Sequence, residues 1–147
     1  MAMTVPADFD VRQFLPYLLN QAAEASSLEF QKVYKDKYGM LRNEWRVLFH
    51  LGIYGEMTAS EIGARAQMHK TKISRAVQRL AERRYLTRNR ATRDRRVEYL
   101  TLTVPGRKVY QDLKAIAADY DAALTEAMSH KDTAILRDLL ARLALRT

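Results

Sequence analysis

The chain has 147 residues, of which 48% are hydrophobic and 29% charged, values typical of a globular protein large enough for one domain with a core. It contains no cysteine, which excludes disulfides, thiolate catalysis and Cys-based zinc sites. No run of residues approaches the roughly 18 apolar positions of a membrane span, and the first residues lack the pattern of a secretory signal. We therefore expect a cytoplasmic protein.

The positive charge is concentrated in one part of the chain. The net charge is +8, but residues 69–108 carry thirteen Lys and Arg against three acids, whereas the remaining residues together have a net charge of −2. A local excess of one sign indicates a polyanionic partner, either nucleic acid or an anionic membrane surface.

The first two predicted helices have clear boundaries. One begins near Pro16, whose fixed φ suits the first turn of a helix, and ends at about Tyr38, before Gly39. The next is "NEWRVLFHLGIYG", which ends at Gly55. It is apolar around most of its circumference, which is typical of a helix buried on several sides.

Two further helices follow closely. Thr58 and Glu61 form a capping-box pattern that opens a short helix, "ASEIGARAQ". The fourth helix is predicted from about Lys70 to Arg84, with an apolar stripe formed by Ile73, Ala76, Val77 and Leu80. The opposite side is polar and mostly basic, with Thr71, Arg75, Gln78 and Glu82 at its centre and Lys72, Ser74 and Arg79 beside them.

The next segment predicts a hairpin with a charged tip. "YLTRN" and "VEYLTLT" are rich in β-branched and aromatic residues, whereas "RATRDR" between them is not. Thr103 is a plausible N-cap for a fifth helix, and a sixth, rich in leucine, is predicted after Ser129. The first, fifth and sixth helices carry more apolar surface than a small winged domain covers, which favours a second copy of the chain as partner.

A short helix, a turn, a basic-faced helix and a basic hairpin, in this order, predict a mainly α protein with a winged helix-turn-helix. A helix fits the major groove of B-DNA, where Arg reads guanine and Gln reads adenine, and a hairpin places Arg in the minor groove. We therefore expect Arg75 and Gln78 to contact bases and Lys72 and Arg79 to contact phosphates.

The segments "NEWRVLFHLG", "MTASEIGARAQMHKTKISRAVQRLAERRYLTR" and "DRRVEYLTLT" resemble the MarR family of transcriptional regulators, and the resemblance covers nearly the whole chain. Its most specific element is the wing signature formed by Asp94, Arg96, Leu102 and Thr103. It implies one MarR-like domain over residues 1–147, with a DNA-binding unit at about 40–103 and dimerisation helices at about 9–38 and 104–147. It also implies a homodimer and, often, a small-molecule effector.

Two positions depart from the family pattern. Arg84 stands where the family usually has Gly, and a left-handed backbone there would cost a non-Gly residue roughly 1 kcal/mol. His69 stands where a short capping acid or hydroxyl is common, so we expect a less firm start to the fourth helix. Neither departure removes a group predicted to contact DNA.

The predicted DNA-binding residues come from the fourth helix and the hairpin tip, where Asp94 is expected to orient Arg96 through a charge-assisted bond. They are Lys70, Thr71, Lys72, Ser74, Arg75, Gln78, Arg79, Arg93, Asp94, Arg95 and Arg96. The expected partners are an inverted-repeat operator in double-stranded DNA and a second copy of the chain. We expect the resulting homodimer to act as a repressor.

A ligand site is predicted around the second helix. Arg46 and His50 are four residues apart on one face, with Trp45 beside them, and the first helix could bring Tyr17 and Gln21 toward the same space. A guanidinium with aromatic neighbours suits a small aromatic carboxylate, which Arg binds bidentately. The alternative is structural: Trp45 in the core, Arg46 paired with an acid and His50 a satisfied buried histidine.

Enzymatic activity is not expected. The histidines His50, His69 and His130 fall on different predicted elements, and no phosphate loop, nucleophile elbow or metal-ligand spacing occurs. We expect no catalytic residues, metal or cofactor. The alternative that stays open is a ligand-independent architectural or RNA-directed protein.

Overall fold

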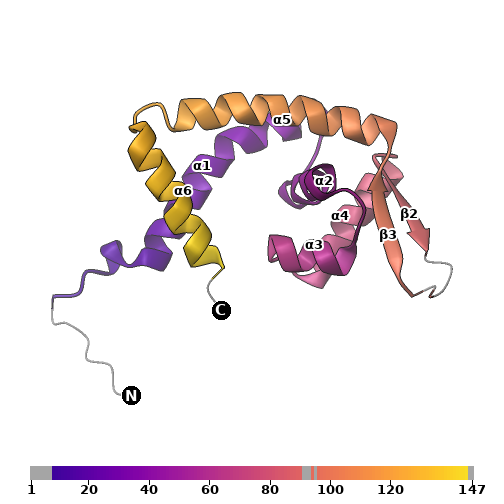
Figure 1. The fold of residues 1–147 in the computed structure, drawn as a ribbon, viewed down its shortest axis with the longest axis horizontal. Helices are drawn as coiled ribbons and strands as arrows, with labels where there is room; N and C mark the ends of the chain where they lie inside the picture. Colours follow the sequence, from indigo (N-terminus) through magenta and orange to yellow (C-terminus); the bar gives the residue numbers. More distant parts are fainter. Residues whose placement is uncertain (1–7, 91–93, 95, 146–147) are drawn as a thin grey trace, which may run out of the picture. The chain divides into compact units, whose positions relative to one another are not determined.

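The computed structural model describes residues 8–90, 94 and 96–145. Within them lie six α-helices and one three-stranded sheet (Figure 1). The helices are α1 (Leu15–Tyr38), α2 (Arg42–Tyr54), α3 (Ala59–Ala66), α4 (Lys70–Glu82), α5 (Val104–Leu124) and α6 (His130–Ala144). The strands are β1 (Met57–Thr58), β2 (Leu86–Arg90) and β3 (Glu98–Leu102), and a 3-10 turn, η1, spans Val11–Gln13.

The chain forms two compact units, which divide between Met40 and Leu41. The first contains η1 and α1. Pro16 occupies the first turn of α1, and Gly39 ends the helix in the left-handed conformation, at φ 62°, as the sequence predicts. The second unit contains all the other elements.

The core of the second unit is built around α2. The side chains of Val47, Leu48 and Leu51 are almost completely buried, as are Ile62 of α3 and Leu80 of α4. Helix α2 contacts α3, α4, α5 and β3. The expectation that α2 is buried on several sides is therefore confirmed.

The sheet has one more strand than the sequence predicts. β2 and β3 form the expected hairpin, with Thr87 opposite Thr101, but β1 pairs antiparallel with the other edge of β3, with Met57 opposite Leu100. β1 has only two residues, so it lacks the alternating pattern by which a strand is detected in sequence. The hairpin therefore extends from a sheet that is fixed to the start of α3.

Local capping agrees with the sequence, with one difference. Thr103 caps α5 through its hydroxyl, as predicted, and the hydroxyl of Ser129 caps α6, the helix predicted to begin after it. The Thr58 hydroxyl accepts from the Glu61 N–H at 3.1 Å, but the Glu61 carboxylate accepts from that same hydroxyl, at 3.2 Å. The cap of α3 is thus formed, although this contact of Glu61 is with the side chain of Thr58 instead of its backbone.

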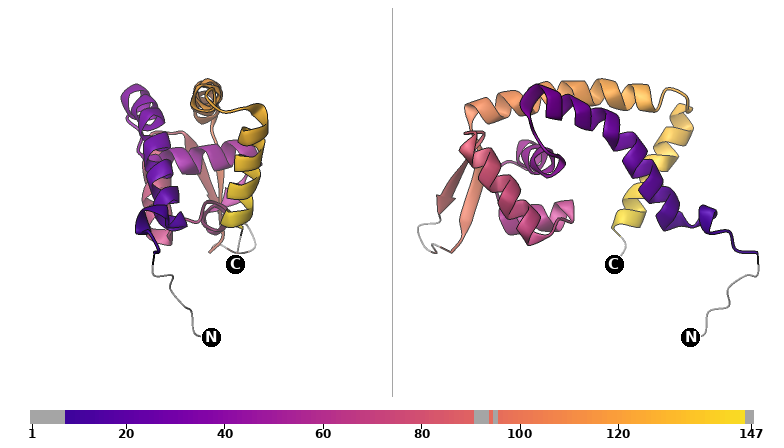
Figure 2. Two further views of the ribbon diagram at one scale, coloured as in Figure 1. Left: turned by 90° about the vertical axis from the view of Figure 1, so that its left-hand side faces the viewer. Right: turned by 180° about the vertical axis from the view of Figure 1, so that it is seen from behind.

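Helix α4 and the hairpin lie side by side in both views of the second unit (Figures 1 and 2). Contacts between α4 and β2 confirm this arrangement. The helix and the hairpin can therefore present their side chains to one partner.

Candidate nucleic-acid interface

Helix α4 has one buried and one exposed face. Ile73, Ala76, Val77 and Leu80 are buried, which confirms the predicted apolar stripe. The side chains predicted to contact DNA are exposed, namely Lys70, Thr71, Lys72, Ser74, Arg75, Gln78 and Arg79. A shallow hollow of about 330 Å³ on this face is lined by Ser74, Arg75, Gln78 and Arg79.

The two residues that depart from the family pattern, His69 and Arg84, lie at the start and just after the end of α4. Nδ1 of His69 accepts from the Thr71 N–H at 3.3 Å, so an imidazole supplies the cap acceptor that a hydroxyl or carboxylate commonly supplies. The helix ends at Glu82, two residues before the predicted end, and Arg84 has φ 60°. The backbone at Arg84 is therefore left-handed, the case in which a non-Gly residue carries the cost given above.

Two contacts with Thr103 follow this exit. Its hydroxyl donates to the Arg84 carbonyl oxygen at 2.7 Å, and its N–H donates to the Tyr85 carbonyl oxygen at 3.0 Å. These bonds join the end of α4 to the end of β3 and the start of α5.

The hairpin tip holds one predicted pair. Asp94 accepts from the backbone N–H of Arg96 at 3.0 Å and from its guanidinium at 3.1 Å and 3.4 Å. These bonds, the side-chain bond first, hold the pKa of Asp94 below its usual value. The predicted charge-assisted bond between Asp94 and Arg96 is present, and the role of Asp94 in orienting Arg96 toward DNA stays a prediction. Arg93 and Arg95 lie outside the described residues.

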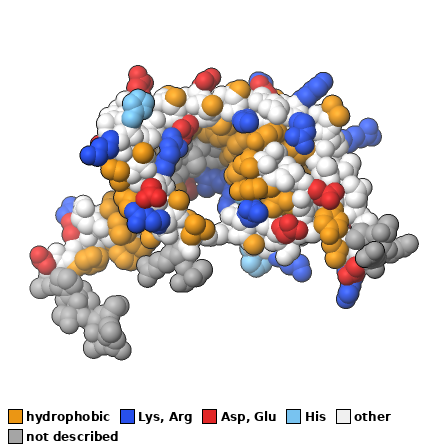
Figure 3. All heavy atoms as spheres, viewed as in Figure 1, with side chains coloured by type: hydrophobic (Ala, Val, Ile, Leu, Met, Phe, Trp, Pro, Cys, Tyr) orange, Lys and Arg blue, Asp and Glu red, His pale blue; other side chains and the backbone are white. Residues whose placement is uncertain are grey.

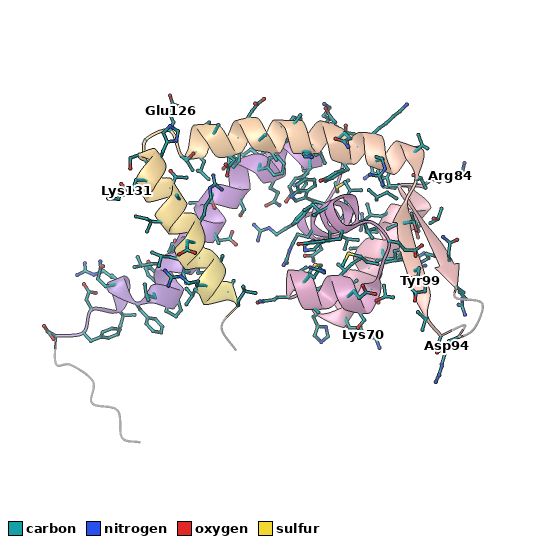
Figure 4. All side chains as sticks on the ribbon, viewed as in Figure 1. Lys70, Arg84, Asp94, Tyr99, Glu126 and Lys131 are labelled. Carbon is teal, nitrogen blue, oxygen red and sulfur yellow. The ribbon has the colours of Figure 1, made fainter. Side chains whose placement is uncertain are left out.

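Some of the basic side chains of the second unit lie on the side of α4 and the hairpin tip. Figure 3 shows Lys and Arg side chains below α3 and α4 and at the far end of the hairpin. Lys70, at the start of α4, and Asp94 lie along the same edge in Figure 4, whereas Arg84 lies at the opposite end of the hairpin. The start of α4 and the hairpin tip thus form one candidate interface.

Arg79 has a partner that the sequence did not predict. Its Nε lies 3.5 Å from Oε2 of Glu44, a carboxylate of α2 that is 1% exposed. The same oxygen accepts from the Leu41 N–H, and Oε1 has no hydrogen-bond partner within the part of the chain that the structure describes. Arg79 therefore both borders the exposed face of α4 and partly neutralises a buried charge, a role that charge patterning alone could not indicate.

The three candidate ligand residues of α2 are close together, but their contacts are partly structural. The Arg46 guanidinium donates to the Ala66 carbonyl oxygen at the end of α3. Burial, and secondarily the charge of Arg42, lowers the pKa of Arg46 from its usual value. Nδ1 of His50 lies 2.6 Å from the Arg46 carbonyl oxygen, so the ring contacts its own helix.

A row of rings runs along α2 beside these residues. The Trp45 and Phe49 ring centres are 5.1 Å apart, Phe49 and His50 are 4.5 Å apart, and His50 and Tyr54 are 6.1 Å apart. Phe49 and Tyr54 are not among the predicted ligand residues, although each lies four residues after a predicted one, Trp45 or His50, on the same helix, a spacing that could have indicated both. Tyr17 and Gln21 lie exposed on α1, in the first unit. Their part in a ligand site stays a prediction.

Two other features, a membrane-spanning helix and a metal site, do not occur among the described residues. No helix among them is long and apolar enough to cross a membrane. No group of three or more His, Asp or Glu side chains in those same residues is arranged to hold a metal ion. What the second unit presents is a basic helix beside a basic hairpin, which defines a winged helix-turn-helix protein of the DNA-binding class.

Comparison with known proteins leads to the same class. Residues 38–97 match the model of the MarR family. The HTH-type transcriptional regulator FarR of Neisseria gonorrhoeae is 27% identical over 127 residues, which cover 86% of each chain. The chain is therefore similar to the MarR family of transcriptional regulators, and the curated proteins that it matches are regulators of transcription, not enzymes.

Solved structures share the fold. NadR in complex with 4-hydroxyphenylacetate has a TM-score of 0.81 at 22% identity, over 99% of this chain and 100% of that one. BpsR of Bordetella bronchiseptica, whose DNA binding is regulated by 6-hydroxynicotinic acid, has a TM-score of 0.86 at 18% identity, over 96% and 100%. The predicted fold class, mainly helical with a small β wing, is confirmed.

Proposed function

We propose that the protein is a homodimeric repressor that binds an inverted-repeat operator and is released from it by a small aromatic carboxylate. The observation that carries the DNA-binding part is the exposed face of α4, which presents Lys72, Arg75 and Gln78 to solvent beside a wing that carries the Asp94–Arg96 pair at its tip. Its place of action is the cytoplasm, where operators are accessible.

The proposed dimer rests on exposed apolar side chains near the end of the chain. Large hydrophobic residues at the end of α5, in the following turn and on α6 are 37% to 50% exposed, namely Leu124, Met128, Ile135, Leu136, Leu139, Leu140 and Leu143. Hydrophobic side chains reach the surface along α6 in Figure 3. A second copy would remove this surface from water and place two copies of α4 about one DNA turn, roughly 34 to 36 Å, apart.

The proposal is tested by footprinting on genomic DNA next to the gene. We expect protection of an inverted repeat at protein concentrations that leave bulk DNA and RNA unprotected, and a dimer by sedimentation. Equal affinity for the repeat, random DNA and RNA would instead support the architectural or RNA-directed alternative.

The wing gives a prediction whose sign separates two models. Asp94→Ala is expected to weaken operator binding about two- to fivefold, although it removes a negative charge, because Arg96 loses its orienting partner. A model that only counts charges predicts tighter binding. The measurement is the operator Kd at constant salt, with Asp112→Ala on α5 as the control for charge.

The Asp94 pair also has a defined dependence on pH. Because the pKa of Asp94 is lowered in the folded protein, its bonds to Arg96 are present above the ordinary carboxylate pKa and are lost as the pH falls through the lowered value.

One outcome would contradict the prediction for Asp94→Ala. Tighter operator binding by this variant at neutral pH would show that the carboxylate only repels phosphate.

The proposed effector is supported by the side chains of α2 and by the ligands named for two proteins of the same fold. NadR and BpsR are named with small aromatic acids, and α2 offers a half-buried guanidinium, Arg46, next to the rings of Trp45 and Phe49. A guanidinium has five N–H donors, so its bond to Ala66 leaves donors for a carboxylate. The ligands named for NadR and BpsR thus both combine an aromatic ring with an acid group, and α2 offers rings and a guanidinium that could bind such a ligand.

We expect benzoates, cinnamates or phenylacetates to change the fluorescence of Trp45, the single tryptophan, and to release operator DNA. Arg46→Ala is expected to shift both responses to at least about tenfold higher concentration, because the bidentate contact is lost. Arg46→Lys is the matched variant, since it keeps the charge without the planar fork. Unfolding midpoints must be compared, because Arg46 also contacts α3. Equal responses of wild type and Arg46→Ala would place the carboxylate contact elsewhere.

A further inference from the structure

The side-chain amide of Gln78 is held at both ends. Its Nε2 donates to Oε1 of Glu82, one turn later on α4, at 2.8 Å. Its Oε1 accepts from Nη1 of Arg88, on β2, at 3.1 Å. The amide therefore has its oxygen toward the wing and its nitrogen toward the end of α4.

Arg88 is itself fixed by the hairpin. Its Nε lies 3.3 Å from Oε1 of Glu98 on β3, and the two side chains are 36% and 34% exposed. In the strand register Arg88 is opposite Leu100, so Glu98 is its diagonal neighbour on the same face of the hairpin, within reach of a long side chain. One network thus links α4, β2 and β3 through four side chains.

The network leaves the amide able to read a base. A glutamine amide has two N–H donors and two acceptor lone pairs, so two bonds use half of its capacity. One N–H and one lone pair remain, which is what a bidentate contact with adenine requires. Without its partners the amide could turn over, because its terminal torsion has two nearly equivalent orientations.

We propose that Arg88 and Glu82 are positioning residues that select one orientation of the Gln78 amide, and that they thereby restrict Gln78 to one orientation of an A·T base pair. This inference rests on the proposed operator binding and adds to it a determinant of sequence preference. Arg88 acts from the middle of β2, so the wing contributes to base reading in the major groove as well as to its own contacts with DNA.

The test measures relative affinities for a set of operator duplexes in which each base pair is varied in turn. Arg88→Ala and Glu82→Ala are expected to reduce discrimination by about three- to tenfold at the base pair where Gln78→Ala also reduces it, and to leave the other positions unchanged. Arg107→Ala on α5 controls for the lost charge of Arg88 and is expected to change no preference. All four residues are exposed, and circular dichroism melts verify that the variants fold.

A double variant separates positioning from direct contact. In the Gln78→Ala background, Arg88→Ala is expected to change no base preference further. If Arg88→Ala lowers affinity for every duplex alike, Arg88 contacts only phosphate and the inference is wrong. If its effect on preference persists without Gln78, Arg88 reads a base itself, which also overturns the inference. A wild type without any preference would contradict operator binding itself, before any variant is compared.

Discussion

Replacing Arg75 with alanine is expected to weaken operator binding by about 1 to 3 kcal/mol, with the loss confined to particular base pairs. Arg75 is exposed on α4, opposite the buried stripe, one turn before Gln78. A guanidinium at this place can donate two bonds to the O6 and N7 atoms of guanine, and alanine leaves those acceptors without partners. A competition assay between operator variants measures both the loss and its position.

Lys72→Ala is the matched control for Arg75→Ala. Lys72 is also exposed on α4 but flanks the face centred on Arg75, so we expect it to contact phosphate. Its removal is expected to weaken binding to all sequences alike and to reduce the slope of log K against log salt by about 0.9 per lost phosphate contact. Unchanged operator preference in Arg75→Ala would show that the wrong face of α4 has been assigned to the bases.

The largest expected loss of stability comes from Gly106→Ala, in the first turn of α5. A Cβ at Gly106 would lie 1.9 Å from the Tyr85 carbonyl oxygen and 2.8 Å from its carbonyl carbon. Because the obstacle is backbone and is itself bonded to the Thr103 N–H, neither side can move without opening the joint between β2, β3 and α5. We expect the free energy of unfolding to fall by about 3 kcal/mol or more, although alanine is the better helix former.

Gly63→Ala on α3 is the comparison for this loss. Its Cβ would meet Cδ1 of Ile73 at 2.8 Å, the far end of a flexible side chain, and the Met68 carbonyl oxygen at 3.3 Å. We expect a loss of about 1 kcal/mol or less, since the isoleucine can change rotamer. Urea unfolding at equal protomer concentration measures both variants, because dimerisation would link stability to concentration. Equal stability of Gly106→Ala and wild type would contradict the close packing of α5 on Tyr85.

The sequence by itself determined the helices, their caps and the two faces of α4. Gly39, Thr103 and Ser129 act within one turn of the residues they cap. Their effect depends on local backbone geometry, so it can be predicted without knowledge of the fold. The apolar stripe from Ile73 to Leu80 can be predicted for the same reason, because a period of 3.6 residues places its members on one side of any α-helix. The Asp94–Arg96 pair spans two residues and was equally local.

Contacts between distant elements were decided only by the tertiary structure. β1 is too short to show alternation and exists because Met57 lies opposite Leu100 on β3. The partner of Arg79 comes from α2, and the partner of the Gln78 amide oxygen comes from β2. A polar residue in sequence offers no indication of which distant group will lie within 3.5 Å of it. Such pairs depend on how the core sets the helices and strands against one another, since a shift of a few ångströms breaks a hydrogen bond but leaves the hydrophobic pattern intact.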